Sequence, residues 1–239
     1  MTLQPEPQNI LSDHKEPDIS VRLYTCGAPL LVPLGEFIIQ KDEKGAVVYD
    51  PCNSESSLIL ENLAIGMGFH WHSTVSARFK GSVRVFRDEK TREWITVNVL
   101  PLEDYLQSVI ASEMSAQAPL EFLKAHAVIS RGWAVGKIYR RHSDARPSSN
   151  SEEFVSWENT SDHCGFDVCS DDHCQRYQGI DKHHSKNPIK AVEDTKGMIL
   201  LDSNGKVADT RFSKCCGGQY RAVLYMLGRY RPRLSPGPK

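Results

Sequence analysis

Apolar residues recur with a helical period in the middle of the chain. Leu102, Leu106 and Val109 stand at positions i, i+4 and i+7 of one stripe, which is the spacing of an amphipathic helix. The next position on that stripe is Glu113. The pattern therefore predicts a helix that begins near Leu102 and carries a carboxylate where an apolar side chain belongs.

A carboxylate on an apolar stripe has two interpretations. Partial burial disfavours the charged form, so a buried Glu113 is expected to have a raised pKa and to hold a proton near neutral pH, as a general acid must. In the alternative, the helix frays near Ser112 and the side chain points into water, as most carboxylates do. Periodicity alone leaves both interpretations open.

A second helical pattern begins at Pro119, because proline is favoured in the first turn of a helix. One apolar stripe consists of Leu120, Leu123, Ala127, Ala134 and Ile138. The opposite side carries Phe122, Ala125, Ile129 and Trp133. Because a helix that is apolar on two faces is usually buried, Arg131, in the middle of the first stripe, is expected to have an internal carboxylate or carbonyl partner. That partner could be Glu113, or Arg131 could bind an anionic substrate.

Short alternating patterns between turn residues predict antiparallel strands in the first hundred residues. The predicted strands are residues 19–24, 36–40, 46–49, 57–60, 75–79, 82–87 and 94–99. Residues 190–197 predict a short helix that ends at glycine, and Asn204-Gly205 predicts a hairpin between 198–202 and 206–209. Together the patterns predict an α+β fold, an antiparallel β-rich scaffold with a packed helix pair and a Cys/His loop insertion.

The same patterns divide the chain into three parts. Residues 1–17 are polar and contain proline, so they are expected to be disordered. Residues 18–218 are expected to form one domain, and residues 219–239 a divergent basic tail. The expected domain has a β-rich part at 18–100, a helical part at 101–195 and a C-terminal hairpin at 196–218.

The amino-acid composition bears on which kinds of molecule the protein binds. Of the 239 residues, 40% are hydrophobic and 25% are charged, and the formal net charge is −1. This balance is that of an ordinary soluble protein and gives no support for nucleic acid or an anionic membrane as a partner. The chain has no apolar run long enough for a membrane span and no signal-peptide core. Neither a span nor an export signal is therefore expected in this chain.

Cysteine and histidine gather in one short stretch. It contains His163, Cys164, Cys169, His173 and Cys174. Without a secretion signal, clustered thiols favour a metal over a disulfide, and zinc takes four such ligands in a tetrahedron. The predicted set is His163, Cys169, His173 and Cys174, with Cys164 as a substitute because adjacent ligands need a sharp turn. Four protein ligands leave no position for water, so the zinc would be structural. A redox disulfide and buried unpaired thiols are the alternatives.

The two helical patterns also carry a resemblance. Residues 97–131 read VNVLPLEDYLQSVIASEMSAQAPLEFLKAHAVISR. They resemble the core of the SpoIID/LytB family, which comprises stage II sporulation protein D and the amidase enhancers. The family motifs match at Leu102-Glu103, Tyr105-Leu106, Ser112-Glu113-Met114, Leu123-Lys124-Ala125, Ala127-Val128 and Arg131. The chain departs from them at Ser115, where proline is usual, and at His126, where glutamine is usual. The resemblance covers roughly residues 18–218 and stops after Gly218.

The resemblance implies a lytic transglycosylase that acts on the glycan strands of peptidoglycan. Glu113 would protonate the glycosidic oxygen and then accept the proton of the attacking muramic acid hydroxyl, and Lys124, His126 and Arg131 would be candidates to hold the sugar. The resemblance also implies zinc in the loop that contains Cys169, and a place in the cell envelope or periplasm. The amidase-enhancer branch assists a separate cell-wall amidase, so a binding module without turnover stays open, as does a zinc-stabilised scaffold that has lost its function.

Overall fold

The computed structural model describes residues 16–68, 70–142, 165–171, 174–182, 185–201, 207–208, 210 and 212. Its strands are β1 (Asp18–Leu23), β2 (Leu31–Leu34), β3 (Phe37–Lys41), β4 (Val47–Pro51), β5 (Ser57–Ile65), β6 (Ser73–Phe79), β7 (Ser82–Arg87), β8 (Trp94–Pro101) and β9 (Val168–Cys169). Its helices are α2 (Leu102–Glu113), α3 (Leu120–His142), the 3₁₀ helix η2 (Ile180–Lys182) and α4 (Asn187–Asp194).

The strands form two sheets. The larger has six strands in the order β3-β4-β7-β8-β1-β9, and the smaller has three in the order β2-β5-β6. Neighbouring strands are antiparallel except for β1 and β9, which pair in parallel through Val21 opposite Val168 and Arg22 opposite Cys169. All seven predicted strands are present, and the predicted α+β class with an antiparallel β-rich scaffold is confirmed.

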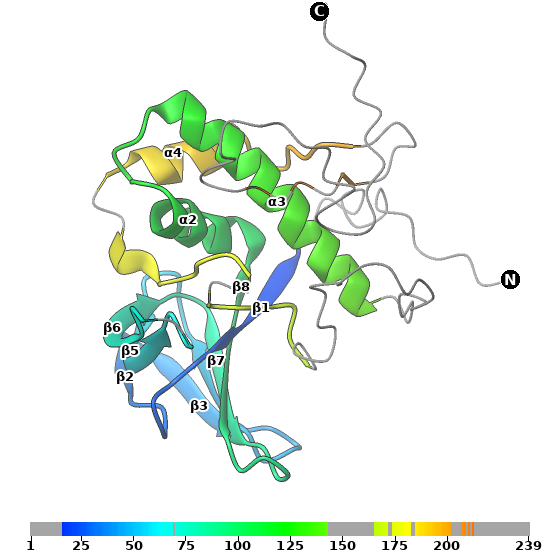
Figure 1. The fold of residues 1–239 in the computed structure, drawn as a ribbon. Helices are drawn as coiled ribbons and strands as arrows, with labels where there is room; N and C mark the ends of the chain where they lie inside the picture. The colour runs from blue at the N-terminus through cyan, green and yellow to red at the C-terminus, as the bar shows by residue number, and fades with distance from the viewer. Residues whose placement is uncertain are drawn as a thin grey trace, which may run out of the picture.

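The helices pack together at one end of the strands (Figure 1). Helix α2 follows β8 without a loop, and the backbone N–H of Leu102 donates to the carbonyl of Pro17 at 3.0 Å. Residues 114–119 then connect α2 to α3, so both predicted helices of the pair are confirmed. The predicted short helix is also present, as α4.

One core joins the helices to both sheets. Its buried members include Ile19, Val21 and Leu23 of β1, Leu60 and Leu63 of β5, Leu102, Leu106 and Val109 of α2, and Leu123, Ala127 and Ala134 of α3. A smaller cluster of Leu58, Val83 and Val85 packs the two sheets against each other. Burying each large apolar side chain stabilises the fold by about 1.5–3 kcal/mol relative to exposure. The core therefore fixes α2 and α3 against the sheets.

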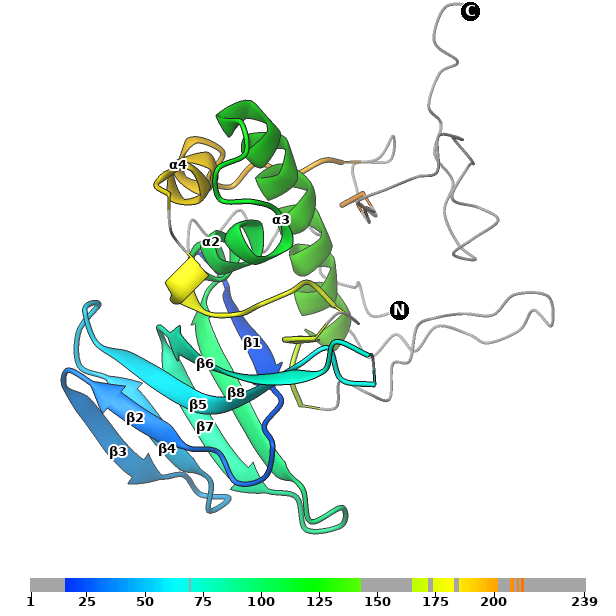
Figure 2. The ribbon, with the colours of Figure 1, turned by 60° about the vertical axis from the view of Figure 1, so that its left-hand side comes forward.

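In its first turns, helix α3 has one buried face and one exposed face. Leu123 and Ala127 are fully buried, whereas Phe122 is 49% exposed. The expectation that both apolar faces are covered is therefore wrong at this end of the helix. The physical reason is that α2 and α4 lie on one side of α3 (Figure 2). Leu123 packs in the core that these helices share.

Parts of the predicted organisation lie outside the described residues. They include residues 1–15, residues 143–164 and the expected tail at 219–239. Of the expected C-terminal hairpin, the structure describes the bridge between Leu201 and Val207. Within the described ranges, no helix combines the length and the apolar character that crossing a bilayer requires.

Candidate functional site

Glu113 is the last residue of α2, and its side chain is partly buried. The helix continues through Ser112 rather than fraying there. The Oε1 atom of Glu113 accepts a hydrogen bond from the backbone N–H of Arg176 at 2.8 Å. Within the described part of the chain, the Oε2 atom has no hydrogen-bond partner. One oxygen of the carboxyl group is thus fixed by the backbone.

The segment that supplies this N–H, residues 174–182, runs along α2. The hydroxyl of Tyr105 donates to Oε1 of Gln175 at 3.1 Å. The hydroxyl of Ser108 donates to the carbonyl of Gly179 at 2.8 Å. Both serine and tyrosine side chains are buried, so these bonds are made away from water and hold the 174–182 segment in register with the helix.

Tyr177 fastens the 174–182 segment to the core. Its ring stacks on that of Tyr105, with 5.2 Å between centroids. Its hydroxyl donates to Oδ1 of Asn98 at 2.6 Å, and Nδ2 of Asn98 donates to the carbonyls of Lys80 and Ser82 at 2.9 and 3.0 Å. Burial raises the pKa of Tyr177 well above its ordinary value, so the hydroxyl keeps its proton and donates this bond throughout the physiological range. The backbone next to Glu113 is therefore held by a buried polar network.

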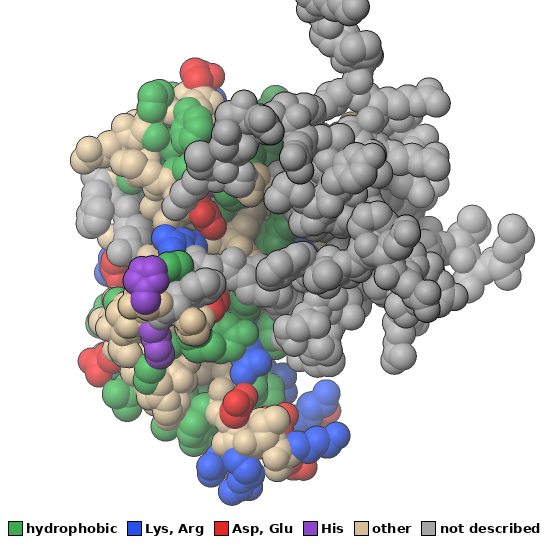
Figure 3. Space-filling model, in the orientation of Figure 1, with side chains coloured by type: hydrophobic (Ala, Val, Ile, Leu, Met, Phe, Trp, Pro, Cys, Tyr) green, Lys and Arg blue, Asp and Glu red, His purple; other side chains and the backbone are tan. Residues whose placement is uncertain are grey.

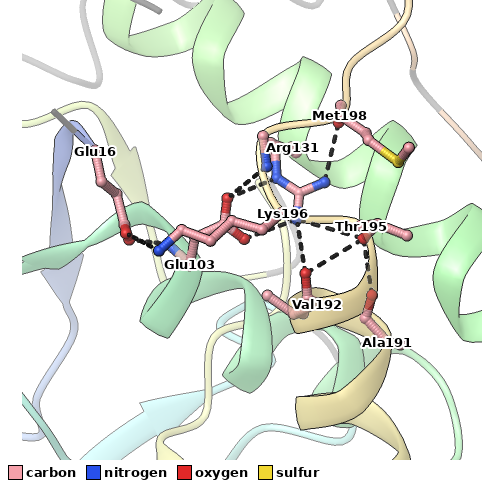
Figure 4. A network of polar contacts seen from close by, with 9 residues as sticks. Glu16, Glu103, Arg131, Ala191, Val192, Thr195, Lys196 and Met198 are labelled. Carbon is pink, nitrogen blue, oxygen red and sulfur yellow. Dashed lines mark hydrogen bonds and ion pairs between the residues drawn. The ribbon is translucent and has the colours of Figure 1, made fainter. Parts of the chain in front are cut away.

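Arg131 lies in a second buried network, shown in Figure 4. Its side chain is 1% exposed. Its Nε and Nη2 atoms donate to the two carboxylate oxygens of Glu103 at 2.9 and 2.7 Å, and Nη1 donates to the carbonyl of Met198 at 3.0 Å. The expected internal partner is thus present, and it is Glu103 rather than Glu113. At this degree of burial the guanidinium joins α2 to α3 and has no access to a substrate.

Lys124 and His126 lie near the start of α3. The Nζ atom of Lys124 contacts the carboxylates of Glu121 at 2.9 Å and Asp194 at 3.0 Å, and these hydrogen bonds raise the pKa of Lys124. His126 is 3% exposed, and its ring meets that of Phe212 edge-on at 4.6 Å. Among the described residues, neither side chain forms a hydrogen bond or ion pair with Glu113.

Two of the predicted metal ligands are brought together. Strand β9 ends at Cys169, which is buried, and Cys174 follows a turn in which its N–H donates to the carbonyl of Asp171 at 3.0 Å. Contact with the side chain of Cys169, together with burial, raises the pKa of Cys174. Burial and then the charge of Cys169 raise the pKa of Tyr24.

The other predicted ligands, His163 and His173, and the substitute Cys164 lie outside the described residues. In the ranges that the structure does describe, no group of three or more His, Cys, Asp or Glu side chains is close enough to hold a metal. Two thiols in contact supply half of a tetrahedral zinc site and are of the ligand type that zinc prefers. Cys169 and Cys174 therefore fit the predicted metal.

A polar cavity of about 330 Å³ lies elsewhere, between β6, α2, η2 and α4. It is lined by Arg78, Lys80, Gln107, Ile180, Asp181 and Ile189. Asp181 pairs with Arg78 at 3.4 Å. Glu113 is not among the residues that line this cavity, so the acid and the cavity are separate features.

Sequence patterns missed the partner of Glu113 altogether. The donor is a backbone N–H of Arg176, and every residue except proline carries such a group. The only available signal was the resemblance of the loop around Cys174, which placed this stretch in the same domain as Glu113.

Comparison with known proteins agrees with the motifs. Residues 90–201 match the family model described as SpoIID, stage II sporulation protein. An uncharacterized protein of Brachyspira hyodysenteriae is 33% identical over 141 residues, which are 59% of this chain and 33% of that protein. The chain thus spans about a third of the length of this relative. Residues 90–201, which include Glu113, Arg131 and both thiols, are therefore similar to the SpoIID family.

Proposed function

We propose that this domain cleaves the glycan strands of peptidoglycan as a lytic transglycosylase, with Glu113 as its single acid and base. The SpoIID match supports a function related to sporulation and the cell wall. The observation that carries the finer proposal is the carboxyl group of Glu113, in which Arg176 holds Oε1 through its N–H at 2.8 Å and Oε2 stays available.

The reaction needs only one carboxyl group because the substrate supplies the nucleophile. Glu113, protonated on Oε2, gives its proton to the glycosidic oxygen as the bond from that oxygen to C1 of the muramic acid breaks. The C6 hydroxyl of the same sugar then attacks C1, and the Glu113 carboxylate takes the hydroxyl proton. The products are a new sugar terminus and a 1,6-anhydro sugar, and no water is consumed. Glycosidases that use water need a second carboxylate.

The hydrogen bond from Arg176 supports this role through orientation. A carboxyl group that rotates freely presents its acidic oxygen to the substrate only part of the time, whereas one fixed at Oε1 keeps Oε2 in a single direction. The 174–182 segment is itself fixed by the buried bonds of Tyr105 and Tyr177. The acid is therefore supported by rigid surroundings.

We also propose that Cys169 and Cys174 hold a structural zinc together with His163 and His173. The chemistry that a bound zinc supplies here is a cross-link between β9 and the 174–182 segment. Of the three residues expected to hold the sugar, Arg131 and His126 are buried in packing contacts, so Lys124, 25% exposed at its side chain, is the one that we retain.

The decisive experiment is a product assay on purified glycan strands. Wild-type protein is expected to release 1,6-anhydro-muramyl products, detected by mass spectrometry. Glu113→Gln keeps the shape of the side chain but cannot give a proton, so the rate is expected to fall by about 10²–10⁴-fold. Glu43→Gln, in the exposed β3–β4 turn, is the matched control and should keep the wild-type rate. Anhydro products at an undiminished rate from Glu113→Gln would refute the proposal.

A second candidate is a glycan-binding module that assists a cell-wall amidase without turnover. The observation that favours it is the position of the described cavity, whose lining does not include Glu113. In that case the wild-type protein would raise the rate of a purified amidase on peptidoglycan. The Glu113→Gln variant would raise the amidase rate by the same factor.

A further inference from the structure

The hairpin that joins β5 and β6 carries an exposed indole. Trp71 lies at its tip and is 44% exposed. We propose that Trp71 is a stacking platform for a pyranose ring of the glycan strand, which would give the domain a sugar-binding contact apart from Glu113. This inference rests on the proposed function for the identity of the sugar.

The indole is held in place by the hairpin itself. Gly66 has a φ of +63°, and a Cβ added there would collide with the Cδ1 and Nε1 atoms of Trp71. Only glycine adopts this conformation readily and also lets the ring lie against the backbone. A ring fixed before the ligand arrives loses little rotamer freedom on binding. The hairpin therefore presents an ordered aromatic surface rather than a loose one.

The surroundings of the indole suit a sugar better than an apolar partner. His70 meets the Trp71 ring edge-on, with 4.7 Å between centroids and 83° between planes. His70 and His72 are both exposed, and Figure 3 shows histidine side chains gathered beside hydrophobic ones on this face of the molecule. The site thus combines an apolar ring with groups that hydrogen-bond.

The glycan of peptidoglycan has the complementary chemistry. Its β-1,4-linked hexosamines carry their ring substituents equatorially, so each ring has flat faces of axial C–H groups and a rim of hydroxyl, ether and amide groups. The flat face can lie on an aromatic ring, because indole combines a large apolar surface with a polar edge. The rim can exchange hydrogen bonds with the imidazoles of His70 and His72.

The tip of the hairpin is tied to the segment that holds the acid. The N–H of Gly66 donates to Oδ1 of Asp171 at 3.2 Å. Five residues later, the N–H of Arg176 holds Glu113. The five-residue step from Asp171 to Arg176 spans at most about 18 Å. A few linked sugar rings reach over this distance. One glycan strand could therefore contact Trp71 while another of its linkages lies at Glu113.

The test is the affinity for a soluble hexamer of β-1,4-linked N-acetylglucosamine, measured by titration calorimetry with the full chain. All proteins carry Glu113→Gln, so that binding is measured without cleavage. Trp71→Ala is expected to weaken binding by at least about tenfold, and Trp71→Phe to retain most of the affinity. The matched control is Trp94→Ala, because Trp94 is 39% exposed and lies against Arg87, away from this hairpin. It should bind as the parent does.

Each outcome is decisive for one of the two proposals. The platform is overturned if Trp71→Ala binds as tightly as the parent, if Trp94→Ala weakens binding equally, or if the parent shows no saturable binding. The phenylalanine variant and a thermal melt of each protein separate a lost contact from a lost fold. If the hexamer binds through Trp71 but wild-type protein releases no anhydro products, the platform stands and the transglycosylase proposal fails.

Discussion

Two glutamates of α2 have different surroundings although they are ten positions apart on one helix. Both carboxylate oxygens of Glu103 accept from Arg131 at 2.9 and 2.7 Å. Glu113 accepts a single bond, from a backbone N–H. A guanidinium presents parallel donors that occupy a whole carboxylate, whereas a lone N–H occupies one oxygen. At the scale of the residue, this difference separates a carboxylate that is bound at both oxygens from one that is bound at a single oxygen.

The sequence predicted the need of Arg131 for a partner but not the identity of that partner. A cation on an apolar stripe must find an internal acceptor, and this is confirmed. Glu103 and Glu113 were both within the same predicted helix, and the choice between them depends on how α2 and α3 pack. Periodicity along one helix contains no information about that packing.

The Glu103–Arg131 pair leads to a prediction about stability. Glu103→Gln leaves a buried guanidinium without its countercharge, so the free energy of unfolding is expected to fall by about 3–5 kcal/mol. Urea unfolding followed by circular dichroism measures the change. Glu121→Gln, which removes an exposed carboxylate from its contact with Lys124, should leave the unfolding curve unchanged.

A double variant checks the cause. Replacing both Glu103 and Arg131 with methionine removes the two charges together, and it is expected to be more stable than Glu103→Gln alone because no unpaired charge remains. A double variant as unstable as the sum of the single variants would show that the ion pair is not the source of the loss.

At the scale of the element, the strands that the sequence missed have specific physical features. Strand β2 contains Pro33, and proline within an apolar run argues against a strand except at the edge of a sheet, which is where β2 lies. Strand β9 is two residues long and owes its existence to pairing with β1. The sequence also placed the end of β5 too early, at residue 60 rather than Ile65, because a register shift between Leu60 and Leu63 interrupts the alternation.

The turn between β6 and β7 gives a prediction with a matched control. Gly81 and Gly45 both have a φ of +79°, but a Cβ at Gly81 would collide with the carbonyl of Val99, whereas nothing lies within 4 Å of a Cβ at Gly45. At either position the left-handed φ lowers the stability of an alanine variant by about 1 kcal/mol. At Gly81, overpacking lowers the stability by about a further 1–3 kcal/mol.

Gly81→Ala is therefore expected to lower the melting temperature clearly more than Gly45→Ala does, as measured by calorimetry. Equal losses in the two variants would mean that the backbone conformation alone requires glycine at position 81, and that the close approach to β8 has no energetic consequence.

At the scale of the whole molecule, the residues that match SpoIID are not a separate body. Strand β8 lies within residues 90–201, yet it pairs with β1 on one side and β7 on the other, and both lie outside the match. The sequence predicted the α+β class because its strand and helix patterns are strong. It could not predict that residues 165–171 lie against β1 and residues 174–182 against α2, because these stretches have no periodic pattern of their own.

The paired thiols give a prediction for the intact protein. Purified protein is expected to contain about one zinc per chain, and a chelator is expected to lower its melting temperature, because a structural metal stabilises only the folded state. Cys174→Ser should lose most of the metal, while Cys52→Ser, at an exposed cysteine, should keep it. Elemental analysis measures the content. Wild-type zinc content in Cys174→Ser would rule out the predicted ligand set.

The pairing of β1 constrains how the chain can fold as it is made. The first strand has β8 on one side and β9 on the other, and β9 is Val168–Cys169. At a synthesis rate of about 5–20 residues per second, one edge of β1 waits on the order of ten seconds for its neighbour to leave the ribosome. During that interval the nascent chain displays an open template for pairing with other strands, and protection from cotranslational aggregation must come from chaperones or from neighbouring nascent segments.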